Sequence, residues 1–242
     1  MASNTETFDL LPGRVLAHKY RIVEKVGVGW EGEVYRVLEL KTEIERAAKL
    51  FYPERNVKGK AVVRYARKLN RLRSCDILVQ YLHYDETLIR RRTIALLVSE
   101  YVEGQQLGQF IRHCPGRRMG VFEALNALHS LAKGVQAIHA HGDYHGDIHT
   151  DNILVKRAGV GFHLKLIDFY DWGRSTRANR QEDVLNLLQV LCEMLGGWKR
   201  YNSFPPQVKK ICRGLKRNLV SQRYDGAGDL IEALDALEWD VE

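Results

Sequence analysis

Hydrophobic residues follow one period in the first part of this chain and another in the rest. Up to about residue 100 they mostly alternate with polar residues, as in residues 20–25 and 33–39, which is the pattern of half-buried strands. After Gly104 they recur every three or four positions, as in residues 121–141, which is the pattern of helices facing a core. Strands first and helices afterwards predict an α+β fold, with a small antiparallel sheet and a larger helical part.

Further elements fill in this outline. In the first part we predict three more strands and one helix, at residues 46–52, 79–83, 94–98 and 60–73. In the second part we predict one buried helix and two surface helices, at residues 184–195, 207–218 and 229–237. All 242 residues are interpreted as a single domain of two lobes, at about residues 15–103 and 105–242, joined by a hinge at about residues 100–104.

Composition and charge narrow the function classes. No apolar run approaches the ~20 residues that a membrane-spanning helix needs. The four cysteines are scattered without a CxxC pair, so we expect a cytoplasmic protein with no membrane partner. The net charge of +7 is typical of solvated basic faces and also suits an acidic or phosphorylated partner. Nucleic acid is not favoured as a partner, because no helix-turn-helix or aromatic-basic pattern is present.

A glycine cluster lies in the turn between the first two long strands. Gly27, Gly29 and Gly32 form a GxGxxG pattern, and glycines let a backbone approach phosphate groups and donate N–H groups to them. A strand follows the cluster, so a dinucleotide-binding motif, which needs a helix there, is not favoured. Lys49 lies on the next apolar strand, where an ammonium group is costly to bury without an anion. A nucleotide phosphate is the natural partner for this lysine.

With these two features the sequence resembles the protein kinase superfamily, in which a GxGxxGxV loop is followed by an A-x-K strand. The resemblance implies a two-lobed fold in which Lys49 binds the α- and β-phosphates of ATP, while Val34 and Ala47 contact adenine. It also implies that residues 97–104 form the linker beside the base, with Ser99 as gatekeeper. The implied ATP-binding residues are Gly27, Val28, Gly29, Gly32, Val34, Ala47, Lys49, Ser99, Glu100, Val102 and Leu154.

The strongest match is the loop that follows the long helix predicted at residues 121–141. Its sequence, His145-Gly146-Asp147-Ile148-His149-Thr150-Asp151-Asn152, has the aspartate-to-asparagine spacing of the family's catalytic loop. The resemblance implies that Asp147 orients and deprotonates the acceptor hydroxyl, and that His149 contacts the γ-phosphate. Asp147, Lys49 and His149 are therefore the candidate catalytic residues.

Two further aspartates extend the resemblance. Asp168 ends a short apolar strand and resembles the family's magnesium ligand, so Asn152 and Asp168 are the implied metal ligands. Asp183 stands just before the predicted buried helix and resembles the aspartate that ties this helix to the catalytic loop. The implied cofactors are ATP and Mg²⁺.

Three departures from the family pattern bear on activity. The helix at residues 60–73 carries no acidic residue, and Tyr65 stands where a glutamate would pair with Lys49. Gly146 and His149 replace an arginine and a lysine that are common in protein kinases, and such a loop resembles those of aminoglycoside and choline kinases. The segment that follows the magnesium strand is short, so we expect the usual platform for a peptide substrate to be trimmed.

Three functions are therefore compared. A serine/threonine protein kinase is favoured, because residues 20–37 resemble bacterial protein kinases of the eukaryotic type. A small-molecule kinase acting on an aminoglycoside, choline or sugar hydroxyl is the alternative, supported by the catalytic loop. A nucleotide-binding pseudokinase that acts as a scaffold is the third, supported by the missing glutamate. The acceptor is expected to be a protein in the favoured case, and the sequence does not identify it.

Overall fold

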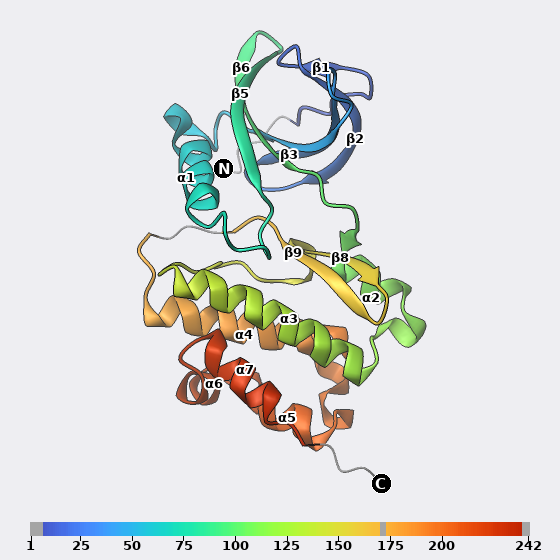
Figure 1. Ribbon diagram of the computed structural model, residues 1–242, viewed down its shortest axis with the longest axis vertical. Helices are drawn as coiled ribbons and strands as arrows, with labels where there is room; N and C mark the ends of the chain where they lie inside the picture. Colours follow the sequence, from blue (N-terminus) through green and yellow to red (C-terminus); the bar gives the residue numbers. More distant parts are fainter. Residues whose placement is uncertain (1–6, 170–172, 239–242) are drawn as a thin grey trace, which may run out of the picture. The chain divides into compact units, whose positions relative to one another are not determined.

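The computed structural model describes residues 7–169 and 173–238. Its chain divides into two compact units, Met1–Ser74 with Val79–Val102, and Cys75–Leu78 with Glu103–Glu242. The first unit is mainly sheet with one α-helix and the second is mainly helical (Figure 1), which confirms the predicted α+β class. Over the described part of the chain, no helix combines the length and the apolar character that crossing a membrane requires.

The first unit is built on a six-stranded antiparallel sheet with the order β1-β2-β3-β4-β6-β5. Its elements are β1 (Val15–Leu16), β2 (Tyr20–Val28), β3 (Gly32–Glu39), β4 (Glu45–Phe51), α1 (Lys60–Arg71), β5 (Tyr81–Ile89) and β6 (Arg92–Glu100). Helix α1 contacts β5 and β6. The predicted strands are confirmed, but β5 and β6 are longer than predicted because their pairing continues to a tight turn. In that turn, Arg90 and Arg91 have φ values of 49° and 62°.

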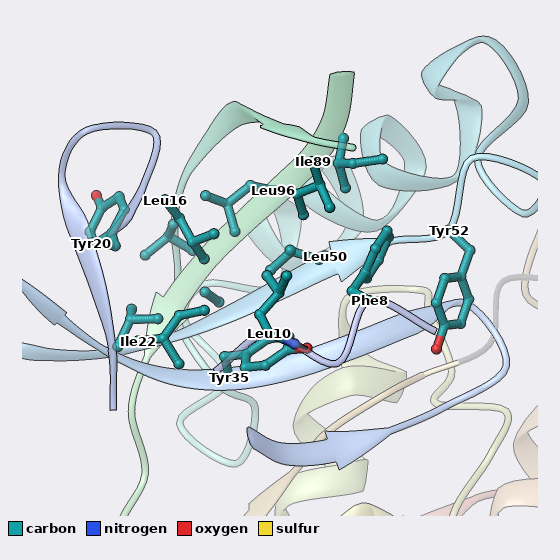
Figure 2. Close-up of a cluster of buried hydrophobic side chains, with 14 residues drawn as sticks. Phe8, Leu10, Leu16, Tyr20, Ile22, Tyr35, Leu50, Tyr52, Ile89 and Leu96 are labelled. Atoms are coloured by element: carbon teal, nitrogen blue, oxygen red, sulfur yellow. Dashed lines mark hydrogen bonds between the residues drawn. The ribbon is translucent and has the colours of Figure 1, made fainter. Parts of the chain in front are cut away.

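Alternate residues of these strands form the core of the first unit. Figure 2 shows 14 buried hydrophobic side chains, to which β3 contributes Tyr35, β4 contributes Leu50 and β6 contributes Leu96. The two outer strands of the sheet approach each other around this core. Lys19 Nζ lies 2.8 Å from Asp85 Oδ2, and Ala17 N donates to Thr87 Oγ1 at 3.2 Å. The sheet is therefore curled around its apolar face.

The segment before β1 is attached to the core by a buried carboxylate that the sequence did not single out. Glu33 is 0% exposed, and its Oε1 accepts hydrogen bonds from Phe8 N at 2.7 Å and from Tyr52 Oη at 3.0 Å. Its Oε2 accepts a hydrogen bond from the Tyr35 hydroxyl and lies 3.2 Å from Lys25 Nζ. Buried carboxylates are stable when they are paired and hydrogen-bonded in this way.

The second unit combines helices with a three-stranded sheet of order β7-β8-β9. Its elements are β7 (Gln105–Gln106), α2 (Leu107–His113), α3 (Val121–Ala140), β8 (Ile153–Ala158), β9 (Gly161–Leu166), α4 (Arg177–Met194), α5 (Pro206–Cys212), α6 (Arg217–Arg223) and α7 (Ala227–Asp235). The long helix α3 contacts α4, α7 and β9, and Figure 1 shows α3 and α4 running alongside each other.

Two helix predictions in this unit are wrong in their bounds. Helix α4 begins at Arg177 rather than near residue 184, because Thr176 and Asn179 form reciprocal hydrogen bonds that cap its first turn. The helix predicted at residues 207–218 is interrupted between α5 and α6, where Arg213 and Gly214 have φ values of 51° and 66°. Positive φ values end an α-helix.

Candidate functional site

The glycine turn of the first unit joins β2 to β3. Gly29 N donates to Gly32 O at 2.8 Å, which closes the turn. Gly32 pairs with Phe51 of β4, and a Cβ on Gly32 would lie 1.9 Å from Leu50 O. The sheet therefore requires glycine at position 32, since any side chain would collide with the neighbouring backbone. Gly27 and Gly29 have no such steric requirement, because no atom lies closer than 4.0 Å to a Cβ at either position.

The strand register brings four of the predicted nucleotide-binding residues to one face of the sheet. Val34 pairs with Lys49, and Ala47 pairs with Ser99. Directly paired residues of antiparallel strands place their side chains on the same face, and so do residues two positions apart on one strand. This face is opposite the one that carries Tyr35 and the hydrophobic core. Val28 does not join the group, since it pairs with Glu33 on the core side and is 59% exposed.

The predicted linker residues lie at the end of β6 and just after it. Glu100 is fixed to the residue that precedes β5, because its N–H donates to Gln80 O and its carboxylate accepts from Gln80 N, both at 3.0 Å. The Ser99 hydroxyl donates to Glu100 O at 3.3 Å. Val102 is half-buried and is the last residue of the first unit. The backbone of this segment is therefore held in place by local hydrogen bonds.

Lys49 of β4 is largely buried and contacts both a carboxylate and aromatic rings. Its Nζ lies 2.9 Å from Glu31 Oε2 in the glycine turn, and its side chain is 11% exposed. The same Nζ lies 4.6 Å from the centre of the Tyr65 ring and 5.3 Å from that of Phe51. Tyr65 of α1 thus contacts Lys49 from the position at which a glutamate is missing from this helix. The carboxylate beside Lys49 comes from the turn instead of the helix.

In the second unit, a buried aspartate at the centre of α4 fixes the loop after α3. Asp183 is 0% exposed, and its two carboxylate oxygens accept hydrogen bonds from His145 N and Gly146 N, each at 2.8 Å. His139 Nε2 lies 3.0 Å from Asp183 Oδ2. The predicted tie between the buried helix and this loop is confirmed. Gly146 has a φ of 85°, a backbone conformation that favours glycine, at the position where protein kinases commonly have arginine.

This loop brings three candidate residues together. Asn152 Nδ2 donates to Asp147 Oδ2 at 3.0 Å and to Asp168 O at 3.3 Å. Ile167 N also donates to Asn152 O at 3.0 Å, which fixes the end of the β9 strand against the loop. Asp168 has a φ of 50°, a conformation that costs a residue other than glycine some free energy and is concentrated at functional sites.

His149 lies beside the candidate base. Its Nε2 is 3.7 Å from Asp147 Oδ2, and both side chains are nearly half exposed. The nearby carboxylate of Asp147 raises the pKa of His149 above its ordinary value, and this effect exceeds the lowering caused by burial. When it is protonated, His149 places a positive charge next to the carboxylate of Asp147.

The donor atoms near Asp168 suit a divalent cation that prefers oxygen. The carboxylate of Asp168 and the amide oxygen of Asn152 are hard ligands of the kind that Mg²⁺ takes. Because Asn152 Nδ2 is used as a donor to Asp147 and Asp168, its Oδ1 is the atom that could meet a cation. Leu154 is half-buried on β8, two residues after Asn152. Residues 170–172, which follow the site in the chain, lie outside the described residues.

Two carboxylates with clear contacts were not assigned from the sequence. Glu31 stands within the glycine motif. An acidic residue in the turn next to the strand that carries Lys49 was a usable signal for an ion pair with this lysine. Glu33 lies on the same face of β3 as Tyr35 and Val37, which are both 0% exposed. A charged residue in such an inward position indicates a buried polar network.

Comparisons with known proteins agree with this geometry. A family model described as protein kinase domain matches residues 20–196, which is more than half of the chain. The probable serine/threonine-protein kinase YbdM of Bacillus subtilis is 27% identical over 92% of this chain and 91% of its own length.

Other relatives match a smaller part. The serine/threonine-protein kinase pkn2 of Myxococcus xanthus is 27% identical over 64% of this chain. The serine/threonine-protein kinase pak-1 of Caenorhabditis elegans is 29% identical over 62% of this chain. The matched region is 18% of the length of the first of these two relatives and 24% of the second.

Proposed function

Because the chain belongs to the protein kinase family, we propose that it is a serine/threonine protein kinase that transfers the γ-phosphate of Mg-ATP to a protein hydroxyl. One observation carries the proposal: Asn152 donates a hydrogen bond to the carboxylate of Asp147, and Asp183 fixes the same loop by accepting hydrogen bonds from its backbone. This arrangement presents a fixed carboxylate to an acceptor. The names of the relatives, including one that matches along nearly its whole length, support a protein as acceptor.

Each candidate residue has a chemical role in this proposal. Lys49 holds the phosphates of ATP, and Asp147 orients the acceptor hydroxyl and takes its proton. Asn152 and Asp168 would hold Mg²⁺, which when bound neutralises phosphate charge. Positioning and electrostatic stabilisation account for most of the catalysis of phosphoryl transfer. The protein therefore needs rigid donors more than a reactive nucleophile, and the hydrogen bonds around Asp147 supply that rigidity.

The test is transfer of label from γ-labelled Mg-ATP, with the purified protein alone and with a cell extract. We expect label on serine or threonine in protein bands, and Asp147→Ala should reduce it by about 10²–10⁴-fold while Mg-ATP binding is retained. Label recovered in small metabolites, or binding without any transfer, would overturn the proposal. Transfer by Asp147→Ala at the rate of the parent would remove Asp147 from its role.

Asp168→Ala tests the proposed metal ligand. This substitution should abolish the Mg²⁺-dependent part of ATP binding, measured by calorimetry with and without Mg²⁺. Asp151→Ala is the matched control, because Asp151 is exposed in the same loop and its carboxylate is not a proposed ligand. If Asp168→Ala bound Mg-ATP with the affinity of the parent, Asp168 would not be a metal ligand.

We further propose that the acceptor is an acidic or phosphorylated protein. Residues 194–224 contain eight Lys or Arg residues and no Asp or Glu, and Lys199 and Lys210 are exposed there. Such a surface attracts negative charge. The double variant Lys199→Glu/Lys210→Glu should raise KM for an acidic peptide and leave KM for a neutral peptide unchanged. An equal change for both peptides would contradict this role.

A further inference from the structure

The lysine of β4 has a carboxylate partner that does not come from a helix. Helix α1 has no acidic residue between Lys60 and Arg71, and its Tyr65 presents a ring to Lys49 at 4.6 Å. A ring face attracts a cation but cannot accept two strong hydrogen bonds as a carboxylate does. The ion pair with Glu31, at 2.9 Å, supplies a charged contact at this point.

Glu31 is held firmly by its backbone. Glu31 O accepts a hydrogen bond from Tyr52 N at 2.8 Å, directly after β4. The neighbouring Trp30 ring lies 4.2 Å from the guanidinium carbon of Arg55, in the same segment. The glycine turn is thus attached to the segment after β4 at two neighbouring residues, Glu31 and Trp30. A side chain on so well-fixed a backbone can restrain its partner, because little further entropy is lost when the pair forms.

Two nearby acidic residues are engaged elsewhere. Glu33 lies on the core side of β3, where Phe8, Tyr35 and Lys25 contact it. Glu54 lies 3.7 Å from Arg92 Nη1. Glu31 is also shielded, with 29% of its side chain exposed, and a partly buried pair is screened less by solvent than an exposed one.

We propose that Glu31 is the positioning residue for Lys49, in the role that the missing glutamate of helix α1 leaves open. The carboxylate pairs with the ammonium group and restricts the lysine side chain, so that this group is oriented for the phosphates of the nucleotide. This inference rests on the proposed function, in which Lys49 binds ATP. It assigns to the glycine turn a second task besides backbone contacts with phosphate.

The experiment moves the carboxylate from the turn to the helix. Glu31→Gln should weaken Mg-ATP binding by about tenfold, measured by calorimetry. The double variant Glu31→Gln/Tyr65→Glu should restore affinity to within about threefold of the parent. Glu31→Gln/Tyr65→Gln is the matched control and should not restore it. Glu24→Gln makes the same change of charge on β2, beside Arg36, and should bind as the parent does.

A second measurement is independent of nucleotide. The pH dependence of Lys49 modification by a small amine reagent, followed by peptide mass spectrometry, reports the basicity of this amine. Glu31→Gln should lower the midpoint pH, and the added Tyr65→Glu should raise it again. A merely structural role of Glu31 would leave this midpoint unchanged and would overturn the proposal. So would Glu31→Gln binding Mg-ATP as tightly as the parent or more tightly, since Glu31 would then compete with phosphate.

The two proposals fail in different ways. If the parent binds Mg-ATP but labels no protein, the proposed kinase activity fails, while the affinities of the variants still decide the role of Glu31. If the parent does not bind Mg-ATP at all, the midpoint pH of Lys49 modification decides the role of Glu31. Thermal unfolding of each variant shows whether it is folded, and an unfolded Glu31→Gln is replaced by Glu31→Asp, whose shorter side chain should give a smaller loss of affinity.

Discussion

Among single residues, the Asp147–His149 pair makes the candidate site sensitive to pH. The nearby carboxylate of Asp147 raises the pKa of His149 above 6.5 in the folded chain. A raised folded pKa means that the pairing stabilises the protein below pH ~6.5, and that this contribution is lost as pH rises through the raised value. Titration of the His149 imidazole by NMR should therefore give a midpoint above 6.5, and Asp147→Asn should lower it. An unchanged midpoint in Asp147→Asn would contradict the pairing.

Single residues also show what the sequence could predict. Lys49, Asp147 and Asn152 could be named as candidates because motif spacing and strand period depend on the chain alone. Tyr65 was placed beside Lys49 from the helical period, and its ring lies 4.6 Å from Lys49 Nζ. The side chain of Glu31 was not placed, because spacing does not tell which residue of a turn folds back onto a neighbouring strand. The orientation of Val28 was missed for a related reason: a register shift between Lys25 and Gly27 changes the alternation of β2.

At the level of elements, the buried carboxylate of Glu33 joins the segment before β1 to the sheet. Burial raises the pKa of Glu33, but hydrogen bonds from Tyr35, Phe8, Lys25 and Tyr52 outweigh it, so the pKa is lowered overall. Glu33→Gln should reduce the free energy of unfolding at pH 7 by about 2–3 kcal/mol, because the donors around it lose a charged acceptor. Urea unfolding measures this change, with the exposed Glu24→Gln as control.

The pH dependence of the same variant has a definite sign. A lowered folded pKa contributes stability that is present above the ordinary value of 4.5 and is lost as pH falls through the folded pKa. The difference in unfolding free energy between the parent and Glu33→Gln should therefore shrink as pH falls below about 4.5. A difference that stayed constant down to pH 3 would show that folding does not lower the pKa of Glu33.

The elements that the sequence misjudged share a physical cause. The hydrophobic period located α3 and the sheet, since it reflects which side of an element is buried. It could not locate the start of α4, which is set by the hydrogen bonds of Thr176 and Asn179. Nor could it show the break between α5 and α6, where Arg213 takes a positive φ. Caps and positive φ values depend on local polar contacts, and an apolar period carries no information about them.

At the scale of the whole chain, the residues proposed to bind Mg-ATP are divided between the two units. Lys49 and the glycine turn belong to the first unit, and Asp147, Asn152 and Asp168 belong to the second. In the sequence, too, the glycine motif and Lys49 precede the expected hinge at residues 100–104, and Asp147, Asn152 and Asp168 follow it. A ligand that binds the native chain and not the unfolded one adds its binding energy to the stability of the native state.

Mg-ATP should therefore raise the melting temperature of the protein. At a concentration of 100 times Kd the added stability is about 2.7 kcal/mol, which for a chain of this size corresponds to about 5–10 °C. Differential scanning calorimetry measures the shift, and EDTA should remove most of it because Asp168 and Asn152 would then lack their cation. Lys49→Ala and Asp168→Ala should each show a much smaller shift than the parent. A parent shift that EDTA and both variants left intact would place nucleotide binding away from these residues, whatever the transfer assay gave.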